Sequence, residues 1–600
     1  MMQNLVRLWI TAIAMNIISR LLFPQLILLF TQIREGWVNT PVSPLIHKPF
    51  PEELRLAFRD RARRMFYDAY DNYIRHAFPM DELNPVNCSG RGRDWNNPDN
   101  ININDALGDY SLTLVDALDS LAVMGNYSEF QRAVKLVIDN VSFEKCSTVQ
   151  VFEANIRVLG ALLSAHLLMM DEEQPFGPLT PEWYNNELLE LAHELGIRLI
   201  TAFDDSKLGI PHPRVNLCMG VPVNGSTHTC TAGAGSLVLE FGLLSRLVGD
   251  PVFEMKARRA VKVLWDHRDP VTGLVGKSYL LGNTLDIQTV QWESNLAGIG
   301  AGMDSFYEYL LKSYVMFGDP DDLYMFNEFY HSIMRYLKKG RACSQWLPGL
   351  TNAPHYVNID MTSGKISNYW TDSLSAFFAG LQVLIGDISE AVCTHAFFYS
   401  IWRRYQSLPE RFDWKSKQPV VFFYPLRPEL IESTYLLYQA TRNPFYLYVG
   451  SDILESLEKH ARNKCGYSTI HNVLDKSHED RMESFFLSET SKYLYLLFDK
   501  ENIVNKRASQ YLFTTEGHII KLDPIFRKPW VDYEGWLDSS TLDMTGSCLK
   551  NSTCGRQHSS KDCGASKMQC ESLHFPHWYD LPLSREELGQ IEALVGLHDT

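Results

Sequence analysis

The chain has 600 residues, of which 45% are apolar and 12% aromatic, and its formal net charge is −15. This length allows several domains, but the apolar content is also sufficient for one large core. The negative charge argues against nucleic acid as a partner, because proteins that bind phosphate backbones concentrate Lys and Arg.

An apolar stretch at the N-terminus predicts entry into the secretory pathway. Arg7 precedes an apolar run at 8–19, and a second run at 21–30 follows Arg20. A short apolar run behind a positive charge is typical of a secretory signal, whereas a membrane span that contains an arginine is costly. We therefore predict a signal peptide or signal-anchor at 1–32, which leaves membrane attachment open, and a linker at 33–50.

Glycosylation sequons support this location. They begin at Asn87, Asn126, Asn140, Asn224 and Asn551. Such triplets also occur by chance, so they agree with secretory entry without proving it.

The chain has 11 cysteines, and this odd number leaves at least one thiol without an intramolecular partner. Cys548, Cys554, Cys563 and Cys570 lie in a C-terminal region rich in Ser, Lys and Gly, without CxxC spacing. That pattern favours local disulfides over a zinc site. We predict a flexible, cysteine-containing tail at 526–600.

Apolar segments of helical length recur along the chain and indicate an all-α domain at 51–525. They begin at residues 111, 151, 235, 302, 372, 427 and 482, and most end at a Gly, Asn, Asp or Pro turn followed by a second helical stretch. Such units cannot bury their apolar faces alone, which suggests a ring or solenoid of helix pairs. The first helices are apolar nearly all round and should form an inner layer. Ordinary helical stacking without a cavity remains an alternative.

Carboxylates recur on these predicted inner helices. They are Asp116, Glu240, Glu308, Glu432 and Glu489 in mid-segment, and Glu153, Asp304, Asp372, Glu429 and Glu483 nearer the helix starts. If the helices run parallel, these acids gather at one rim. Any single one is more simply a cap or an ion-pair partner, but so many at one rim suggest a site.

The chemistry that fits clustered acids is glycoside hydrolysis, in which one carboxyl protonates the leaving oxygen and another activates water. Surplus carboxylates also suit a hard cation such as calcium. Neighbouring aromatic residues, Phe152, Tyr307, Phe485 and Phe486, could stack on sugar rings, although core packing explains most of them equally well.

Long ordered motifs carry a family resemblance. They include "STVQVFEANIRVLGALLSAH", "GMDSFYEYLLK", "YPLRPELIESTYLLYQAT", "DRMESFFLSETSKYLYLLF" and "FTTEGH". Over about residues 51–520 they resemble glycoside hydrolase family 47, the class I α-1,2-mannosidases. The stretch at 101–122 and "TCTAGAGSL" resemble the ER degradation-enhancing members in particular. The resemblance implies an (α/α)7 barrel, dependence on Ca²⁺ and an inverting mechanism.

The same resemblance implies roles for individual residues. Glu153 matches an acid that protonates the leaving group, Asp304 a second carboxylate with an acid role, and Glu429 the general base. Thr515 matches the residue that binds calcium. The residues matched to the substrate site are Arg157, Arg427, Glu432, Glu483, Phe485 and Glu489.

Two cysteine features follow from the comparison with the family. Ala376 stands where processing mannosidases carry a cysteine, so their disulfide is expected to be absent. Cys88 and Cys465 match a pair that joins the two ends of the barrel in the degradation-enhancing members.

Two main hypotheses follow. The first is an enzyme in the lumen of the endoplasmic reticulum that trims N-glycans of misfolded glycoproteins, with a partner of the disulfide-isomerase type. The second is a mannose-binding lectin without turnover. An adaptor that binds unfolded protein through its tail is compatible with either.

Overall fold

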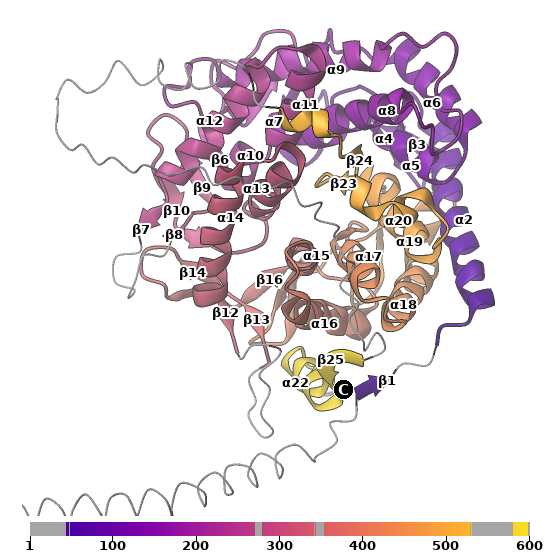
Figure 1. The fold of residues 1–600 in the computed structure, drawn as a ribbon, viewed down its shortest axis with the longest axis vertical. Helices are drawn as coiled ribbons and strands as arrows, with labels where there is room; N and C mark the ends of the chain where they lie inside the picture. Colours follow the sequence, from indigo (N-terminus) through magenta and orange to yellow (C-terminus); the bar gives the residue numbers. More distant parts are fainter. Residues whose placement is uncertain are drawn as a thin grey trace, which may run out of the picture.

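Helix pairs arranged in a ring make up the body of the protein (Figure 1). The computed structural model describes residues 44–46, 49–270, 279–340, 343, 353–528, 530 and 580–597. The predicted signal segment at 1–32 lies outside this range, as do the four cysteines of the predicted tail.

The inner layer consists of the segments that the apolar pattern predicted. Its helices are α4 (Leu112–Asp116), α5 (Leu118–Val123), α8 (Gly160–Met170), α11 (Val238–Val248), α13 (Asp304–Phe317), α15 (Phe377–Leu384), α17 (Glu429–Thr441) and α19 (Ser491–Phe498). Every residue of α5 and of α19 is buried. Burial on all sides explains why no amphipathic stripe is visible in these segments.

The outer layer is amphipathic. Its helices are α2 (Glu52–His76), α6 (Tyr127–Asn140), α9 (Glu187–Leu199), α12 (Val252–Asp266), α14 (Pro320–Ser332), α16 (Ile388–Tyr405) and α18 (Phe445–His460). Helix α6 buries Phe130, Ala133, Val134 and Val137, a helical spacing that faces the inner layer. Helix α2 packs against α19, so the first long helix of the chain covers the last inner one and closes the ring.

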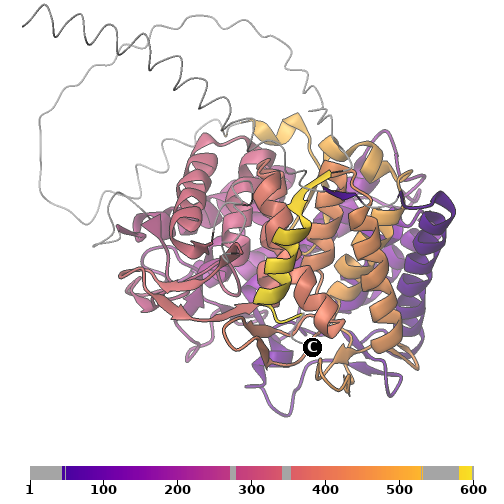
Figure 2. The same ribbon diagram turned by 90° about the horizontal axis from the view of Figure 1, so that it is seen from below.

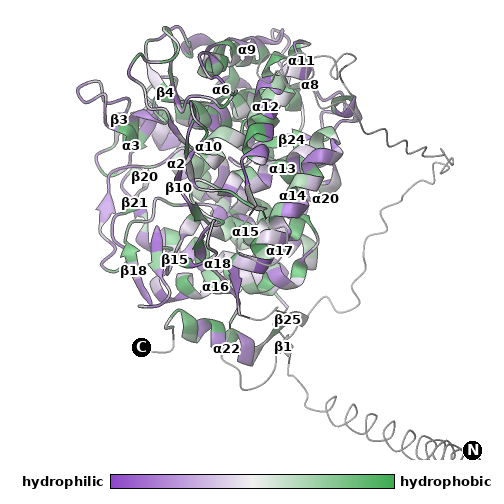
Figure 3. Cartoon of the chain, turned by 90° about the vertical axis from the view of Figure 1, so that its left-hand side faces the viewer, coloured by the Kyte–Doolittle hydropathy of each residue, from purple (hydrophilic) through white to green (hydrophobic). Residues whose placement is uncertain are grey.

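Short antiparallel hairpins lie mainly at one end of the ring (left side of Figure 3). They include β2 (Glu82–Asn84) with β3 (Ser89–Arg91), β4 (Thr148–Gln150) with β5 (Arg214–Asn216), β16 (Trp370–Asp372) with β17 (Arg411–Asp413) and β18 (Gln418–Val421), and β21 (Thr469–Ile470) with β22 (His478–Glu479). Strand β4 runs directly into the helical turn α7 (Val151–Glu153). The starts of successive inner helices, and the acids on them, therefore share this end.

A further hairpin, β23 (Tyr511–Phe513) with β24 (Ile519–Lys521), enters the ring (Figure 1). Strand β24 contacts α8, where the Ser164 hydroxyl donates to the Ile519 carbonyl at 2.7 Å. The tip of this hairpin, residues 514–518, thereby reaches the interior of the ring.

The end of the chain returns to the outer layer. Strand β25 (Asp580–Ser584) pairs antiparallel with β1 (Pro44–Ile46), and helix α22 (Arg585–Leu594) lies against α16 (Figure 2). Ile591 and Val595 are fully buried, and the Arg404 guanidinium donates to the Val595 carbonyl at 2.6 Å. The predicted flexible tail thus contains a folded strand and helix in its last part, which the sequence analysis did not anticipate.

Three disulfides are present among the described residues. Cys88–Cys465 joins the start of the barrel to its end, Cys146–Cys218 flanks the β4–β5 pair, and Cys343–Cys393 attaches a loop to α16. Ala376 is buried beside α15 and provides no sulfur, as expected from the sequence. Cys230 carries the one free thiol of the described part of the chain.

Candidate active site

A cavity of about 280 Å³ lies where the inner helices begin. The predicted site residues that line it are Glu153, Arg157, Asp304, Arg427, Glu429, Glu432, Phe485, Glu489 and Thr515. Of the predicted site residues, Glu483 is not in this lining. The lining residues are far apart in the sequence. Helices, a loop and the tip of the β23–β24 hairpin bring them together in one site.

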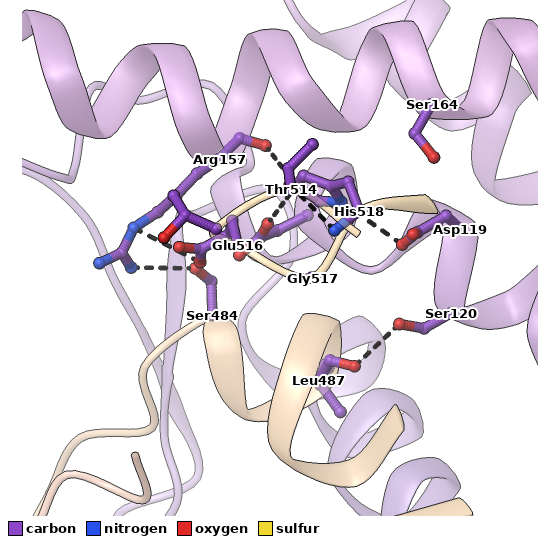
Figure 4. A network of polar contacts seen from close by, with 12 residues as sticks. Asp119, Ser120, Arg157, Ser164, Ser484, Leu487, Thr514, Glu516, Gly517 and His518 are labelled. Atoms are coloured by element: carbon purple, nitrogen blue, oxygen red, sulfur yellow. Dashed lines mark hydrogen bonds and ion pairs between the residues drawn. The ribbon is translucent and has the colours of Figure 1, made fainter. Parts of the chain in front are cut away.

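Glu153 and Arg157 lie on one inner segment, where α7 passes into the π-helical turn η1 (Ala154–Leu159). The Arg157 Nε donates to Glu153 Oε2 at 2.7 Å. Its Nη1 donates to the Ser484 hydroxyl at 3.2 Å (Figure 4). Burial opposes its charge, yet Glu153 and Glu516 hold the pKa of Arg157 well above its ordinary value. Turns of this kind are frequent at functional sites, and η5 (Phe486–Thr490), which carries Glu489, is another.

Asp304 and Glu429 each begin an inner helix. Asp304 accepts a hydrogen bond from the Ser305 amide at 2.9 Å. Burial and then the charge of Asp372 raise the pKa of Asp304 well above its ordinary value. Burial also raises the pKa of Glu429 to about 7, against the opposing effect of Arg427. The cavity therefore holds two carboxyl groups whose pKa values are raised, and one of them, Glu429, titrates near neutral pH.

Phe485 forms an aromatic floor between two guanidinium groups. The Arg157 and Arg427 guanidinium carbons lie 5.3 and 5.9 Å from its ring centroid. Glu410 holds Arg427 with two hydrogen bonds of 2.7 and 2.6 Å. Sequence reasoning missed Glu410, because it lies in a loop ahead of β17 and outside the repeated segments.

Glu483 lies between two arginine side chains and is not among the residues that line the cavity. Its Oε1 is 2.9 Å from Arg481 Nη1, and its Oε2 is 3.8 Å from Arg157 Nη1. Arg481 in turn makes two hydrogen bonds to Glu82, at 2.7 and 3.1 Å. Glu483 is thus placed to orient Arg157 from outside the cavity.

Thr515 stands at the tip of the β23–β24 hairpin. Its amide donates to the Tyr309 hydroxyl at 3.3 Å, and that hydroxyl donates to Glu240 at 2.6 Å. Gly517 has a φ of +71°, and a Cβ there would come within 2.9 Å of the Glu489 side chain. Glycine therefore fits both the backbone conformation of this turn and the space beside Glu489.

A buried ionic network fixes the base of the same turn (Figure 4). The Lys492 ammonium donates to the Asp119 carboxylate at 2.8 and 2.9 Å and to the Gly517 carbonyl at 2.6 Å. His518 lies 3.5 Å from Asp119 and 3.2 Å from Asp116. Burial would lower the pKa of His518, but its hydrogen bonds with Asp116 and Asp119 raise it to about 9.

The residues around Thr515 fit a hard cation. Burial, and then Glu308, raise the pKa of Glu432 to about 8. Burial and the charge of Glu516 raise the pKa of Glu489 well above its ordinary value. Carboxylate and hydroxyl oxygens of this kind suit Ca²⁺, which would relieve their mutual repulsion. Among the described residues, no group of three or more His, Cys, Asp or Glu side chains could hold a metal ion, and the calcium ligand Thr515 stays a prediction from the sequence.

The acids of the inner segments divide into two groups. Glu153, Asp304, Glu308, Glu429, Glu432 and Glu489 line the cavity. The others have structural partners: Asp372 caps the turn η4 (Ser373–Ala376) by accepting from the Ser375 amide at 3.1 Å, and Glu240 accepts from Tyr309 and Asn155. Sequence reasoning did not assign Gln150, Cys230 or Glu516 to the site, although Glu516 follows Thr515 in the same motif.

A cavity lined by several carboxyl groups inside a ring of paired helices suits glycoside hydrolysis, which uses a pair of carboxyl groups beside the scissile bond. The family described as glycosyl hydrolase family 47 matches residues 65–522, and the chain belongs to this family. An α-1,2-mannosidase from Trichoderma reesei shares the fold, with a TM-score of 0.67 and 24% identity over 78% of this chain and 99% of that one. The predicted (α/α)7 barrel is confirmed.

The curated relatives include the ER degradation-enhancing group, as predicted. The chain is 44% identical to ER degradation-enhancing alpha-mannosidase-like protein 1 of Schizosaccharomyces pombe, over 77% of this chain and 56% of that protein. It is 42% identical to ER degradation-enhancing alpha-mannosidase-like protein 3 of Homo sapiens, over 83% of this chain and 52% of that protein. It therefore spans about half the length of these two relatives. Alpha-mannosidase I MNS4 of Arabidopsis thaliana is 44% identical over 85% of this chain and 77% of that protein.

Proposed function

We propose that the protein is an inverting α-1,2-mannosidase that trims N-glycans of misfolded glycoproteins in the endoplasmic reticulum. The observation that carries this proposal is the presence of Glu153, Asp304 and Glu429 in one cavity with the aromatic floor Phe485. The names of the relatives support the location and the class of substrate. Incubation with a high-mannose glycan tests it: released mannose is expected, and glycan binding without release would favour the lectin hypothesis.

The mechanism assigns the proton transfers to three carboxyl groups. Glu429 accepts a proton from the attacking water, and its pKa of about 7 suits a general base near neutral pH. Burial raises the pKa of Asp304, which favours its protonated form, and Asp304 lies in the same cavity as Glu153. Glu153 and Asp304 together donate the proton to the leaving oxygen. Arg157 holds the Glu153 side chain in place through its hydrogen bond. Inversion requires space for a water between the base and the sugar ring.

A bound Ca²⁺ would supply positive charge and sugar-hydroxyl coordination beside Thr515, Glu432 and Glu489. A ligand that binds only the folded state adds about 2.7 kcal/mol of stability at a hundredfold excess over its Kd. We therefore expect a chelator to lower the melting temperature and to abolish mannose release. Chelator preloaded with calcium is the control. Unchanged melting and unchanged release in chelator would contradict the calcium assignment.

The proposed location predicts a pattern of glycan occupancy. Asn224 is exposed, and within the described ranges no hydrogen bond joins its side chain to another residue. Asn87, in contrast, uses its side-chain amide to donate to Asp480 at 2.7 Å and precedes the bonded Cys88. We expect glycan on Asn224 and none on Asn87 in protein from a eukaryotic secretory host. Enzymatic deglycosylation in ¹⁸O-water with peptide mass spectrometry measures both sites. A glycan on Asn87 would contradict the expectation, and unmodified Asn224 would weaken the proposed location.

Membrane attachment and a disulfide-isomerase-type partner remain predictions from the sequence. Two described helical segments, Val151–Met170 and Thr231–Val248, are long and apolar enough to cross a membrane, but they are 83% and 78% buried inside the ring. Their hydropathy is accounted for by their place in the barrel core.

A further inference from the structure

Glu410 holds the guanidinium group of Arg427 from one side. Arg427 Nε donates to Glu410 Oε2 at 2.7 Å, and Arg427 Nη2 donates to Glu410 Oε1 at 2.6 Å. Burial would raise the pKa of Glu410, but the charge and the hydrogen bonds of Arg427 hold it below its ordinary value, so the carboxylate stays ionised. Two parallel bonds of this kind fix a planar guanidinium group in orientation as well as in position.

The third nitrogen of this guanidinium group stays available. Within the described ranges Arg427 Nη1 makes no hydrogen bond, and it is not one of the polar atoms that burial leaves unsatisfied, so it keeps accessible surface. The side chain of Arg427 is 21% exposed and lines the catalytic cavity. Its guanidinium carbon lies 5.9 Å from the ring centroid of Phe485, which lines the same cavity. A charged donor with two free hydrogens is thus left beside the aromatic floor.

The sheet of β16, β17 and β18 carries Glu410 to this position. Glu410 directly precedes β17, and its amide donates to the Phe423 carbonyl at 2.9 Å. Its carbonyl accepts from the Ser373 amide at 3.1 Å, and its Oε2 accepts from the Ser373 hydroxyl at 3.0 Å. The carboxylate is therefore held by its own backbone and by Ser373 as well as by the arginine.

We propose that Glu410 is a positioning residue, which holds Arg427 side-on so that Arg427 Nη1 donates to a hydroxyl of the bound sugar. The inference rests on the proposed function for the class of ligand, an α-linked mannose residue. Glu410 is not among the residues that line the cavity, so it acts through Arg427. A neutral hydroxyl is a suitable acceptor, because Glu410 already balances the charge of Arg427.

Loss of Glu410 would release the guanidinium group. The charges of Glu429 and Glu483 also attract Arg427, so the freed group can turn toward either of them. Arg427 Nη1 would then no longer be aimed at the sugar hydroxyl. The expected result is weaker sugar binding in a protein that is still folded.

Calorimetric titration of the full-length protein with S-linked α-1,2-mannobiose tests the proposal, because the sulfur bridge prevents hydrolysis. We expect Glu410→Gln to weaken binding about tenfold, the size of one lost charge-assisted hydrogen bond. Ser373→Ala, which removes one bond to Glu410 and keeps the ion pair, should weaken it about twofold. Glu458→Gln is the matched control, because Glu458 pairs with Arg61 at 2.6 Å between two outer helices, and binding should not change. Melting curves establish that each variant is folded.

A double-mutant cycle separates positioning from a general effect on the fold. In the Arg427→Met background, Glu410→Gln should cause no further loss of binding, because Glu410 acts through Arg427. A purely structural role predicts that the two losses add. Glu410→Asp keeps the charge but is one methylene shorter, and it should weaken binding about as much as Glu410→Gln.

The outcomes keep this inference apart from the proposed function. Unchanged binding in Glu410→Gln, or a full further loss in the Arg427→Met background, overturns the positioning role. Wild-type affinity in Glu410→Asp also overturns it, because charge alone would then suffice. If the cycle shows the expected coupling while the wild type releases no mannose from a high-mannose glycan, the role of Glu410 stands and the proposed activity fails. Where mannose is released, Glu410→Gln should raise KM more than it lowers kcat, and a loss confined to kcat would contradict the inference.

Discussion

Glu429→Gln is expected to lower mannose release from a high-mannose glycan by about 10²–10⁴-fold, with little change in melting temperature. The amide keeps the size of the side chain but cannot accept a proton from water. Glu429 is the first residue of α17, and in the part of the chain that the structure describes no hydrogen bond joins its carboxyl group to another side chain, so we expect the fold to tolerate the amide. Single-turnover assays with a labelled glycan measure the rate.

Glu153→Gln and Asp304→Asn serve as comparisons in the same assay. Loss of rate in both would indicate a shared acid role. If Glu153→Gln kept full activity and Asp304→Asn lost it, Asp304 alone would be the acid. Full activity in Glu429→Gln would contradict the assignment of the base.

Lys492→Met is expected to lower the free energy of unfolding by about 3–5 kcal/mol. The Lys492 ammonium is fully buried and is bonded to both oxygens of Asp119 and to the Gly517 carbonyl. Its removal leaves the buried Asp119 charge without its strongest partner and loosens the turn that positions Thr515. Urea unfolding followed by circular dichroism measures the change.

Two controls belong to this experiment. The pair Lys492→Met with Asp119→Asn removes both charges and should recover part of the loss. Lys500→Met breaks an exposed ion pair with Glu52, whose side chains are 47% and 54% exposed, and such pairs contribute about 0–1 kcal/mol. A loss in Lys492→Met as small as that in Lys500→Met would contradict the structural role of this network.

The inner helices could be predicted from the sequence because each combines an apolar run with a turn residue. Leu112–Asp116, Leu118–Val123 and Ser491–Phe498 are buried throughout, and their sequences are correspondingly apolar. The position of acids near the helix starts likewise predicted their gathering at one end. These features are local, so a single sequence displays them.

Features that depend on contacts between distant segments were not predictable. The closure of the ring by α2, a helix at the start of the chain, against α19 near the end of the barrel leaves no local pattern. The same holds for the packing of α22 on α16. The support of Arg427 by Glu410 and the bond between Cys343 and Cys393 also join segments that no periodicity relates.

The carboxylates show the same division. The pattern identified the acids but not which of them face the cavity, because Asp372 and Asp304 both lie near a segment start and are both followed by Ser. Only the fold distinguishes the cap at Asp372 from the cavity-lining Asp304. The resemblance to the family supplied the roles that composition and spacing could not.

The most direct test of the account is the anomeric form of the mannose that the wild-type protein first releases from a high-mannose glycan. Proton NMR spectra recorded before mutarotation distinguish the two anomers. The resemblance to the family implies an inverting mechanism, so we expect β-mannose, the inverted product. Release of α-mannose would contradict the inverting mechanism, and binding of the glycan without any released mannose would contradict the enzyme itself.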